Sequence, residues 1–232
     1  MIDWAWIAGH LDELGYRTLQ HLYLTSVTVA VGLAISFGLA VWAVRQRAAL
    51  GPVIAISGLL YTIPSLALFP FFVPLTGLTD LTAVIPLVLY SLLIFIRNIV
   101  AGFDAVPVDV LEAADGTGYT RAARFRRIEL PLATPLVVAG IRLAAVSTIG
   151  LVTITGLIGD KFGGLGFFIF EGYRHSFETE IFAGALASIG LAVAVDLVLV
   201  RLQRRLTPWS RPAEVARAIG VPRPVTGPGM GV

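Results

Sequence analysis

Five apolar segments, each about as long as a membrane-spanning helix, constrain this chain more than any other feature. A helix needs roughly 20 apolar residues to cross the hydrocarbon core of a bilayer. Segments of that kind lie at 20–44, 53–74, 82–102, 134–158 and 180–200. Apolar residues make up 56% of the 232 residues and charged residues only 14%, with a mean hydropathy of +0.85. A soluble surface needs more polar side chains, so the pattern predicts an all-α integral membrane protein with about five transmembrane helices.

The two ends of the chain differ from this transmembrane domain, which we place at 20–206. Residues 1–19 mix Trp4 and Trp6 with acidic and polar residues and lack a basic stretch, so we expect an interfacial segment rather than a cleavable signal peptide. The tail at 207–232 is rich in proline and glycine, which predicts disorder. The chain contains no cysteine, which excludes disulfides, thiol catalysis and a lipidated cysteine anchor.

Basic residues predict the orientation of the chain in the membrane. Thirteen arginines lie near the end of, or after, the first, third and fifth apolar segments, whereas only Arg17, Lys161 and Arg174 fall on the other side. The positive-inside rule then places the N-terminus outside, and the C-terminus and the 103–133 loop in the cytoplasm. This distribution also accounts for the sequence pI of 9.2 without nucleic acid, so we expect the lipid bilayer as a partner and no nucleic acid.

Three prolines, Pro64, Pro70 and Pro74, interrupt the second apolar segment. Proline removes a backbone donor, and such a break survives in a membrane only where protein or a water-filled cavity satisfies the backbone. This segment is therefore the candidate for lining a translocation pathway. An alternative is simple helix packing, with the hydroxyls bonded to local carbonyls. The candidate pathway residues are Tyr61, Thr62, Pro64, Ser65 and Phe69.

The 103–133 loop carries a spaced motif between two apolar segments. It reads E-A-A at 112–114, then three residues, Gly118, nine residues and I-x-L-P at 128–131. We expect short helices over 109–114 and 119–127, because Gly116 and Gly118 between them can supply the positive φ of a turn. Two helices joined by a tight turn form a rigid knob that suits a groove on a partner. The alternative is an ordinary basic loop.

This motif resembles the cytoplasmic loop by which the membrane subunits of bacterial ABC importers contact their ATPase. Further stretches resemble the permeases that import glycine betaine, choline and carnitine. These stretches are Y-T-I-P-S-L-A-L at 61–68, L-L-I-F-I-R-N at 92–98, T-I-G at 148–150, L-I-G at 157–159 and G-G-L-G at 163–166, with one departure at 160–162. The resemblance implies that the ATPase-coupling residues are Glu112, Ala113, Ala114, Gly118, Ile128, Leu130 and Pro131.

The family implies a type I ABC importer permease fold in the bacterial inner membrane. It also implies two ATPase subunits, a second permease subunit that is identical or paralogous, and an extracytoplasmic solute-binding protein. The chain lacks G-x-x-x-x-G-K-[ST], so we expect no enzyme activity and no bound cofactor, with ATP and Mg used by the partner ATPase. The expected solute is an osmoprotectant; an amino acid or another small organic solute is the alternative.

Other function classes lack support in the sequence. A membrane-embedded enzyme would need a motif such as H-E-x-x-H or G-x-S-x-G, or a cysteine nucleophile, and the chain has none of them. A stand-alone channel or secondary carrier leaves the loop motif unexplained. His10 and His21 are isolated and predict no metal site.

Two groups of charged residues leave alternatives open. Arg142 lies inside the fourth apolar segment, where it either snorkels to the surface or pairs, with Asp196 as a possible partner. The segment around Glu171 forms a charged outer loop that either docks the binding protein or is simply solvated. Its charged members are Glu171, Arg174, His175, Glu178 and Glu180.

Overall fold

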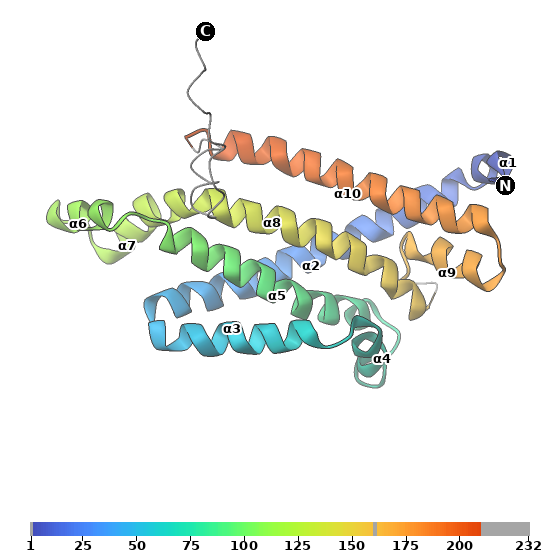
Figure 1. Cartoon of the computed structure of the whole chain (residues 1–232), viewed down its shortest axis with the longest axis horizontal. Helices are drawn as coiled ribbons and strands as arrows, with labels where there is room; N and C mark the ends of the chain where they lie inside the picture. The colour runs from blue at the N-terminus through green and yellow to red at the C-terminus, as the bar shows by residue number, and fades with distance from the viewer. Residues whose placement is uncertain (1, 160–161, 210–232) are drawn as a thin grey trace, which may run out of the picture.

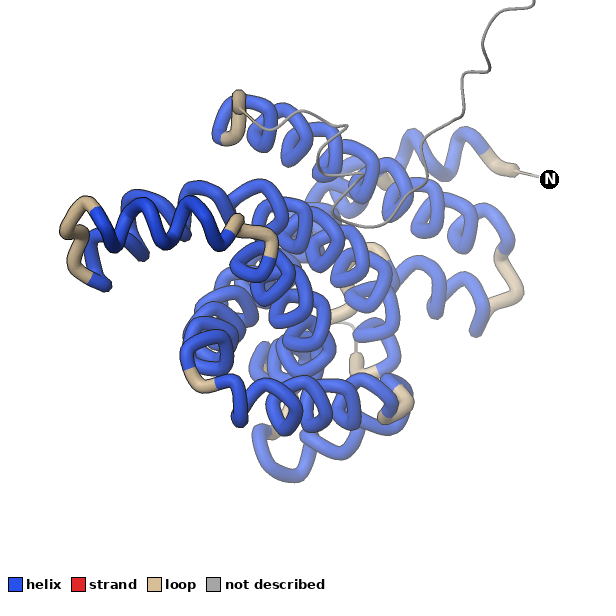
Figure 2. Tube along the Cα trace, turned by 60° about the vertical axis from the view of Figure 1, so that its left-hand side comes forward, coloured by secondary structure: helices blue, strands red, loops and turns tan. Residues whose placement is uncertain are grey.

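The computed structural model describes residues 2–159 and 162–209, and within these ranges the chain is helical with short connecting loops and no strand (Figure 2). The predicted disordered tail lies almost entirely outside the described residues, as does Lys161. The elements are α1 (Trp4–Gly9), α2 (Leu11–Arg45), α3 (Arg47–Thr62), α4 (Ser65–Thr76), α5 (Asp80–Asp104), α6 (Val108–Gly116), α7 (Arg121–Arg124), the π-helix η1 (Phe125–Glu129), α8 (Leu130–Val152), the 3-10 helix η2 (Thr153–Leu157), α9 (Gly166–Arg174) and α10 (Glu178–Leu206).

Five passes along the bundle confirm the predicted fold class. Four helical stretches are long and apolar enough to cross a membrane, namely α2, α5, the continuous stretch Arg121–Leu157, and α10. The pair α3 and α4 makes a fifth if it is counted as one bent span. The α6 and α7 helices project from one end of the bundle, where α10 also ends, and α1 and α9 lie at the opposite end (Figure 1).

Helix α5 forms the centre of the bundle because its sequence is apolar on nearly every side. It packs against α2, α8, α3 and α4, and Leu87, Phe95 and Ile99 on it are fully buried. The facing side of α2 carries small residues three or four positions apart, which lets the two backbones approach closely. The buried residues of that side are Leu24, Thr25, Thr28, Gly32, Ser36, Ala40 and Ala43.

The N-terminal segment differs from the expected separate interfacial segment. Asp3 caps the short α1 by accepting hydrogen bonds from the amides of Ala5 and Trp6, both at 3.0 Å. Helix α2 then starts at Leu11 and runs for 35 residues across the expected boundary at 19. At 1.5 Å per residue it is roughly 52 Å long, so it extends beyond a hydrocarbon core of about 30 Å. A contact from the Asp3 amide to Thr179 Oγ1, at 3.0 Å, holds α1 on α10.

The second apolar segment bends at one proline only. Ile63 is extended, with φ −66° and ψ 129°, as expected for a residue before proline, and α3 and α4 meet there at 94°. Pro70 and Pro74 remain inside α4. Proline has a helical φ and removes one hydrogen bond, so it need not end a helix unless the preceding residue leaves the helical conformation.

Candidate functional site

The bend after α3 leaves a carbonyl that the chain satisfies from another helix. The hydroxyl of Tyr90, on α5, donates to the carbonyl of Ile63, which has lost its helical partner. The Tyr61 ring lies 5.9 Å from the Tyr90 ring, centroid to centroid, with the planes at 77°. Thr62 bonds its own helix, donating to the Leu59 carbonyl at 2.7 Å. The break is therefore held open by a specific contact between α3 and α5.

A pocket of about 460 Å³ lies beside this break. Four of the predicted pathway residues line it, whereas Phe69 is only 1% exposed and instead lines a smaller, apolar pocket of about 240 Å³ between α4 and η2. Among the described residues, no charged side chain lines the larger pocket. Its lining comprises Tyr61, Thr62, Ile63, Pro64, Ser65, Tyr90, Ser91, Ile94, Ser147, Thr148, Gly150 and Leu151.

Sequence reasoning missed four of the seven hydroxyl side chains that line this pocket. Tyr90 and Ser91 come from α5, and Ser147 and Thr148 from α8. The available signal was a pair of adjacent hydroxyl residues in the middle of an otherwise apolar segment, which occurs once in each of these two helices. The sequence alone could not show that both hydroxyl pairs face the bend between α3 and α4.

The projecting loop is built from α6, a tight turn and α7. Thr117 ends α6: its amide donates to the Ala113 carbonyl, and its hydroxyl donates to the carbonyls of Ala113 and Ala114, all at 3.0 Å. Gly118 then takes a φ of +83°, as predicted. Gly116 is the last residue of α6 and does not have a positive φ, so the expectation for it was wrong; the turn needs only one left-handed residue.

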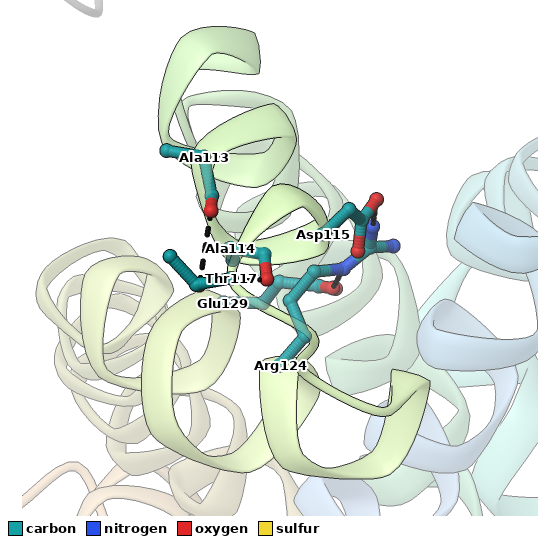
Figure 3. A network of polar contacts seen from close by, with 6 residues as sticks. All are labelled: Ala113, Ala114, Asp115, Thr117, Arg124 and Glu129. Atoms are coloured by element: carbon teal, nitrogen blue, oxygen red, sulfur yellow. Dashed lines mark hydrogen bonds and ion pairs between the residues drawn. The ribbon is translucent and has the colours of Figure 1, made fainter.

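Arg124 ties the two sides of the loop together (Figure 3). Its Nε donates to Glu129 Oε1 at 2.8 Å, and its Nη1 donates to Asp115 Oδ2. Asp115 belongs to α6, and Glu129 is the last residue of η1, directly before α8. One guanidinium therefore fixes the orientation of α6 relative to α8, a role that the sequence reasoning did not assign.

The second loop helix is continuous with the membrane helix. It begins at Arg121 rather than at residue 119, because Thr120 caps it by accepting from the Ala123 amide at 3.3 Å. It does not end at 127 but passes through η1 directly into α8. Phe125 in η1 stacks on Phe103 of α5, with centroids 5.5 Å apart, and Arg45 of α2 lies 5.0 Å above the Phe125 ring. The loop is thus rigidly joined to α8 and braced on the bundle.

The seven predicted coupling residues divide by exposure. Glu112, Ala113 and Gly118 are exposed, so they are available to a partner. Ala114 is buried at 4% exposure, and Leu130 packs against the core. Ile128 and Pro131 are half-buried and line a shallow pocket with Trp209. Some residues of the motif therefore hold the loop in place, and others are exposed to a partner.

Arg142 forms the ion pair that the sequence offered as one alternative. Its Nε and Nη2 donate to the two carboxylate oxygens of Asp196, at 3.0 and 3.2 Å. Its Nη1 donates to Gln203 Oε1 at 3.1 Å, and the Gln203 amide donates to the Pro135 carbonyl at 3.3 Å. These contacts fasten α10 to α8.

At the opposite end of the bundle, α2 holds the glycine turn at 163–166. The Gly164 amide donates to Gln20 Oε1 at 3.1 Å, and the Leu165 amide donates to His21 Nδ1 at 3.3 Å. His21 Nε2 lies 2.9 Å from the Ile149 carbonyl, and because Nδ1 accepts, Nε2 carries the proton and donates. Arg17 lies 3.7 Å above the Phe167 ring. His21 is fully buried and structural, and no group of metal-binding side chains occurs among the described residues.

The charged segment between α9 and α10 lies at the same end as the glycine turn (Figure 1). Glu171 pairs with Arg174 at 3.3 Å and lies 3.5 Å from His175 Nδ1. Glu180 is only 8% exposed, whereas the side chains of Arg174 and His175 are mostly exposed. Docking of a binding protein here stays a prediction.

Solved structures give the fold. The chain matches a chain of the MetNI methionine ABC transporter, in an inward-facing conformation, with a TM-score of 0.73 and 21% identity, covering 84% of this chain and 96% of that one. A second crystal form of the same transporter matches with a TM-score of 0.69. The chain therefore has the type I ABC importer permease fold.

Sequence comparison gives the family. Residues 30–212 match the family described as "Binding-protein-dependent transport system inner membrane component". The choline transport system permease protein OpuBB of Bacillus subtilis is 37% identical over 84% of this chain and 89% of its own length. The osmoprotectant import permease protein OsmW of Salmonella typhimurium is 42% identical over 85% and 95%. The chain belongs to this family of inner membrane transport components, and is the membrane subunit rather than the ATPase.

Proposed function

We propose that this chain is the transmembrane subunit of an ATP-driven importer for a small osmoprotectant such as glycine betaine, choline or carnitine. The charge-free pocket at the α3–α4 break is the observation that carries the proposal. Its hydroxyl and aromatic lining suits a small solute that carries its own charges and must leave again, since weak contacts favour passage. The relatives include a choline permease and an osmoprotectant permease, which supports this solute class.

The projecting loop is the proposed contact for the ATPase. Glu112, Ala113 and Gly118 are exposed on it, and the helix that starts at Arg121 continues to Leu157. Ser147 and Thr148 lie on this same helix and line the pocket. From Leu130 to Ser147 the distance along the helix is roughly 26 Å at 1.5 Å per residue. A displacement of the loop by the ATPase would therefore move one wall of the pocket directly.

The proposed orientation puts the loop and the C-terminus in the cytoplasm and the N-terminus outside. The arginines at the loop end support this, since Arg45, Arg47 and Arg121 all lie there together with the end of α10. The glycine turn and the charged α9–α10 segment would then face the solute-binding protein.

The proposed assembly has two permease subunits, identical or paralogous, two ATPase subunits and one extracytoplasmic binding protein. The pocket beside α3 is open on the surface of the described chain, which supports a second subunit that completes the pathway. We propose that the chain binds no cofactor itself and that ATP and Mg act on the partner ATPase.

Binding by the partner solute-binding protein tests the proposal most directly. Calorimetric titration with glycine betaine, choline and carnitine should give tight binding of at least one of them. ATP-dependent uptake of the same solute by the reconstituted complex should follow. Tight binding of an amino acid alone would favour the second candidate, an importer of another small zwitterion. The pocket would suit the net charge of such a solute equally. Binding of a metal, phosphate or sugar would contradict both.

A further inference from the structure

The pocket offers a cation no carboxylate, but it offers aromatic rings. Tyr61 is 46% exposed and Tyr90 is 5% exposed, and their rings stand nearly perpendicular to one another. In the part of the chain that the structure describes, no acidic or basic side chain lines the pocket. A quaternary ammonium group has no N–H to donate and is recognised instead by the negative face of an aromatic ring.

The two rings are positioned differently. Tyr90 is fixed, because its hydroxyl is bonded to the Ile63 carbonyl and its ring is buried. Tyr61 lies on the last turn of α3, directly before the bend, and it is the ring that remains accessible. Tyr90 therefore supports Tyr61, and Tyr61 presents its ring to the pocket.

The remaining polar groups suit the other end of such a solute. Ser65 begins α4, and Ser147 and Thr148 come from α8 on another side of the pocket. Within the described part of the chain, no hydrogen bond joins these three hydroxyls to another residue. They can donate to a carboxylate or accept from a hydroxyl. The volume of about 460 Å³ is within the range of small-molecule sites.

We infer, resting on the proposed function, that Tyr61 is the residue that contacts the quaternary ammonium group of the solute as it crosses this pocket, with Tyr90 as its positioning residue. Cation–π attraction without a fixed negative charge gives a site that recognises the group and also releases it. The ring of Tyr61, not its hydroxyl, is the part that matters.

The test uses the complete transporter, with its ATPase and binding protein, reconstituted in proteoliposomes with radiolabelled glycine betaine, choline and carnitine. Tyr61→Phe keeps the ring and should retain uptake within about twofold. Tyr61→Leu should lower kcat/KM for uptake by roughly tenfold or more, as expected for loss of a desolvated cation–π contact. Tyr23→Leu is the matched control, because Tyr23 is 52% exposed and lies outside the pocket, and uptake should be unchanged. Co-purification with the ATPase shows that each variant assembles.

Several outcomes would overturn this inference. Normal uptake by Tyr61→Leu would overturn it alone and leave the proposed function intact, as would a loss in Tyr61→Phe equal to that in Tyr61→Leu. If Tyr61→Leu fails to assemble, Tyr61→Trp is tested in its place. The tryptophan ring attracts cations more strongly, so uptake by Tyr61→Trp should be at least as high as uptake by Tyr61→Phe. Lower uptake by Tyr61→Trp than by Tyr61→Phe would contradict the inference. A wild-type complex that imports none of the three solutes would overturn both the proposed function and the inference.

Discussion

The two ends of this molecule hold their loops in different ways. The glycine turn at 163–166 is fixed by side chains of α2 that lie 144 positions earlier in the chain, and Leu165 within it is fully buried. The tip of the projecting loop at the other end is held by contacts within the loop, such as that of Arg124 with Asp115 nine positions away, and much of its surface is exposed. Its base packs on the bundle through Phe125 and Phe103. The first arrangement anchors a turn to the bundle. The second makes a rigid unit that is presented to a partner and joined to α8.

This difference predicts which property each substitution changes. Changes at the glycine turn should reduce the stability of the permease itself. Changes at the projecting loop should leave the permease folded and reduce the coupling of ATP hydrolysis to uptake. The four predictions below run from the largest to the smallest expected effect on stability.

Gly166→Ala should have the largest effect. A Cβ at this position would lie 1.9 Å from the backbone carbonyl oxygen of Thr153, and backbone cannot move aside as a flexible side chain can. We expect a destabilisation on the order of 4 kcal/mol or more and loss of assembled protein. Gly190→Ala on α10 is the matched control, because nothing lies within 4 Å of its Cβ. The yield of folded protein by size-exclusion chromatography in detergent measures the difference, and equal yields would contradict the anchored turn.

His21→Leu should have the second largest effect. It keeps a side chain of similar bulk but leaves the Leu165 amide and the Ile149 carbonyl without their partner. Each buried unsatisfied group costs about 1–3 kcal/mol, so we expect a loss of roughly 2–4 kcal/mol, measured as a lower midpoint of thermal unfolding in detergent. His10→Leu serves as the control, because within the described residues the His10 ring contacts its own segment, where it bonds the Trp6 carbonyl and stacks on the Trp6 ring. A midpoint equal to that of wild type would show that the α2 contacts do not hold the turn.

His21 also marks the limit of what the sequence could predict. Helix number, the bend at Pro64 and the left-handed Gly118 follow from local rules: length, apolarity, and the backbone chemistry of proline and glycine. The Arg142–Asp196 pair joins residues 54 positions apart and was one of the alternatives that the sequence left open. His21 appeared isolated because its partners lie 128 and 144 positions away. The same applies to Tyr90, whose acceptor exists only because another helix bends. Contacts between distant segments depend on how the helices pack, and a single sequence carries no direct signal for that.

Gly118→Val tests the projecting loop with a smaller effect on stability. A Cβ at Gly118 meets nothing within 4 Å, so the loss of stability comes only from placing a side chain at a φ of +83°. For an L-residue this loss is about 1–2 kcal/mol. The permease should insert and purify, but the displaced turn should lower ATP-coupled uptake at least tenfold. Gly116→Ala, a helical position with open space, should leave uptake unchanged. Unchanged uptake by Gly118→Val would show that this turn is not the ATPase contact.

Arg124→Gln should have the smallest effect on stability. The Arg124 side chain is 25% exposed and its partners Asp115 and Glu129 are 54% and 19% exposed, so solvent screening limits the contribution of these pairs to about 1 kcal/mol or less. The same change frees α6 from α8, however, so a movement of α6 would reach the pocket wall less completely. We expect ATP hydrolysis to continue while solute imported per ATP hydrolysed falls severalfold. Arg126→Gln, an exposed position with no ion pair among the described residues, is the control for loss of one positive charge. An unchanged ratio of uptake to hydrolysis in Arg124→Gln would mean that α7 and η1 alone carry the movement to α8, without the guanidinium.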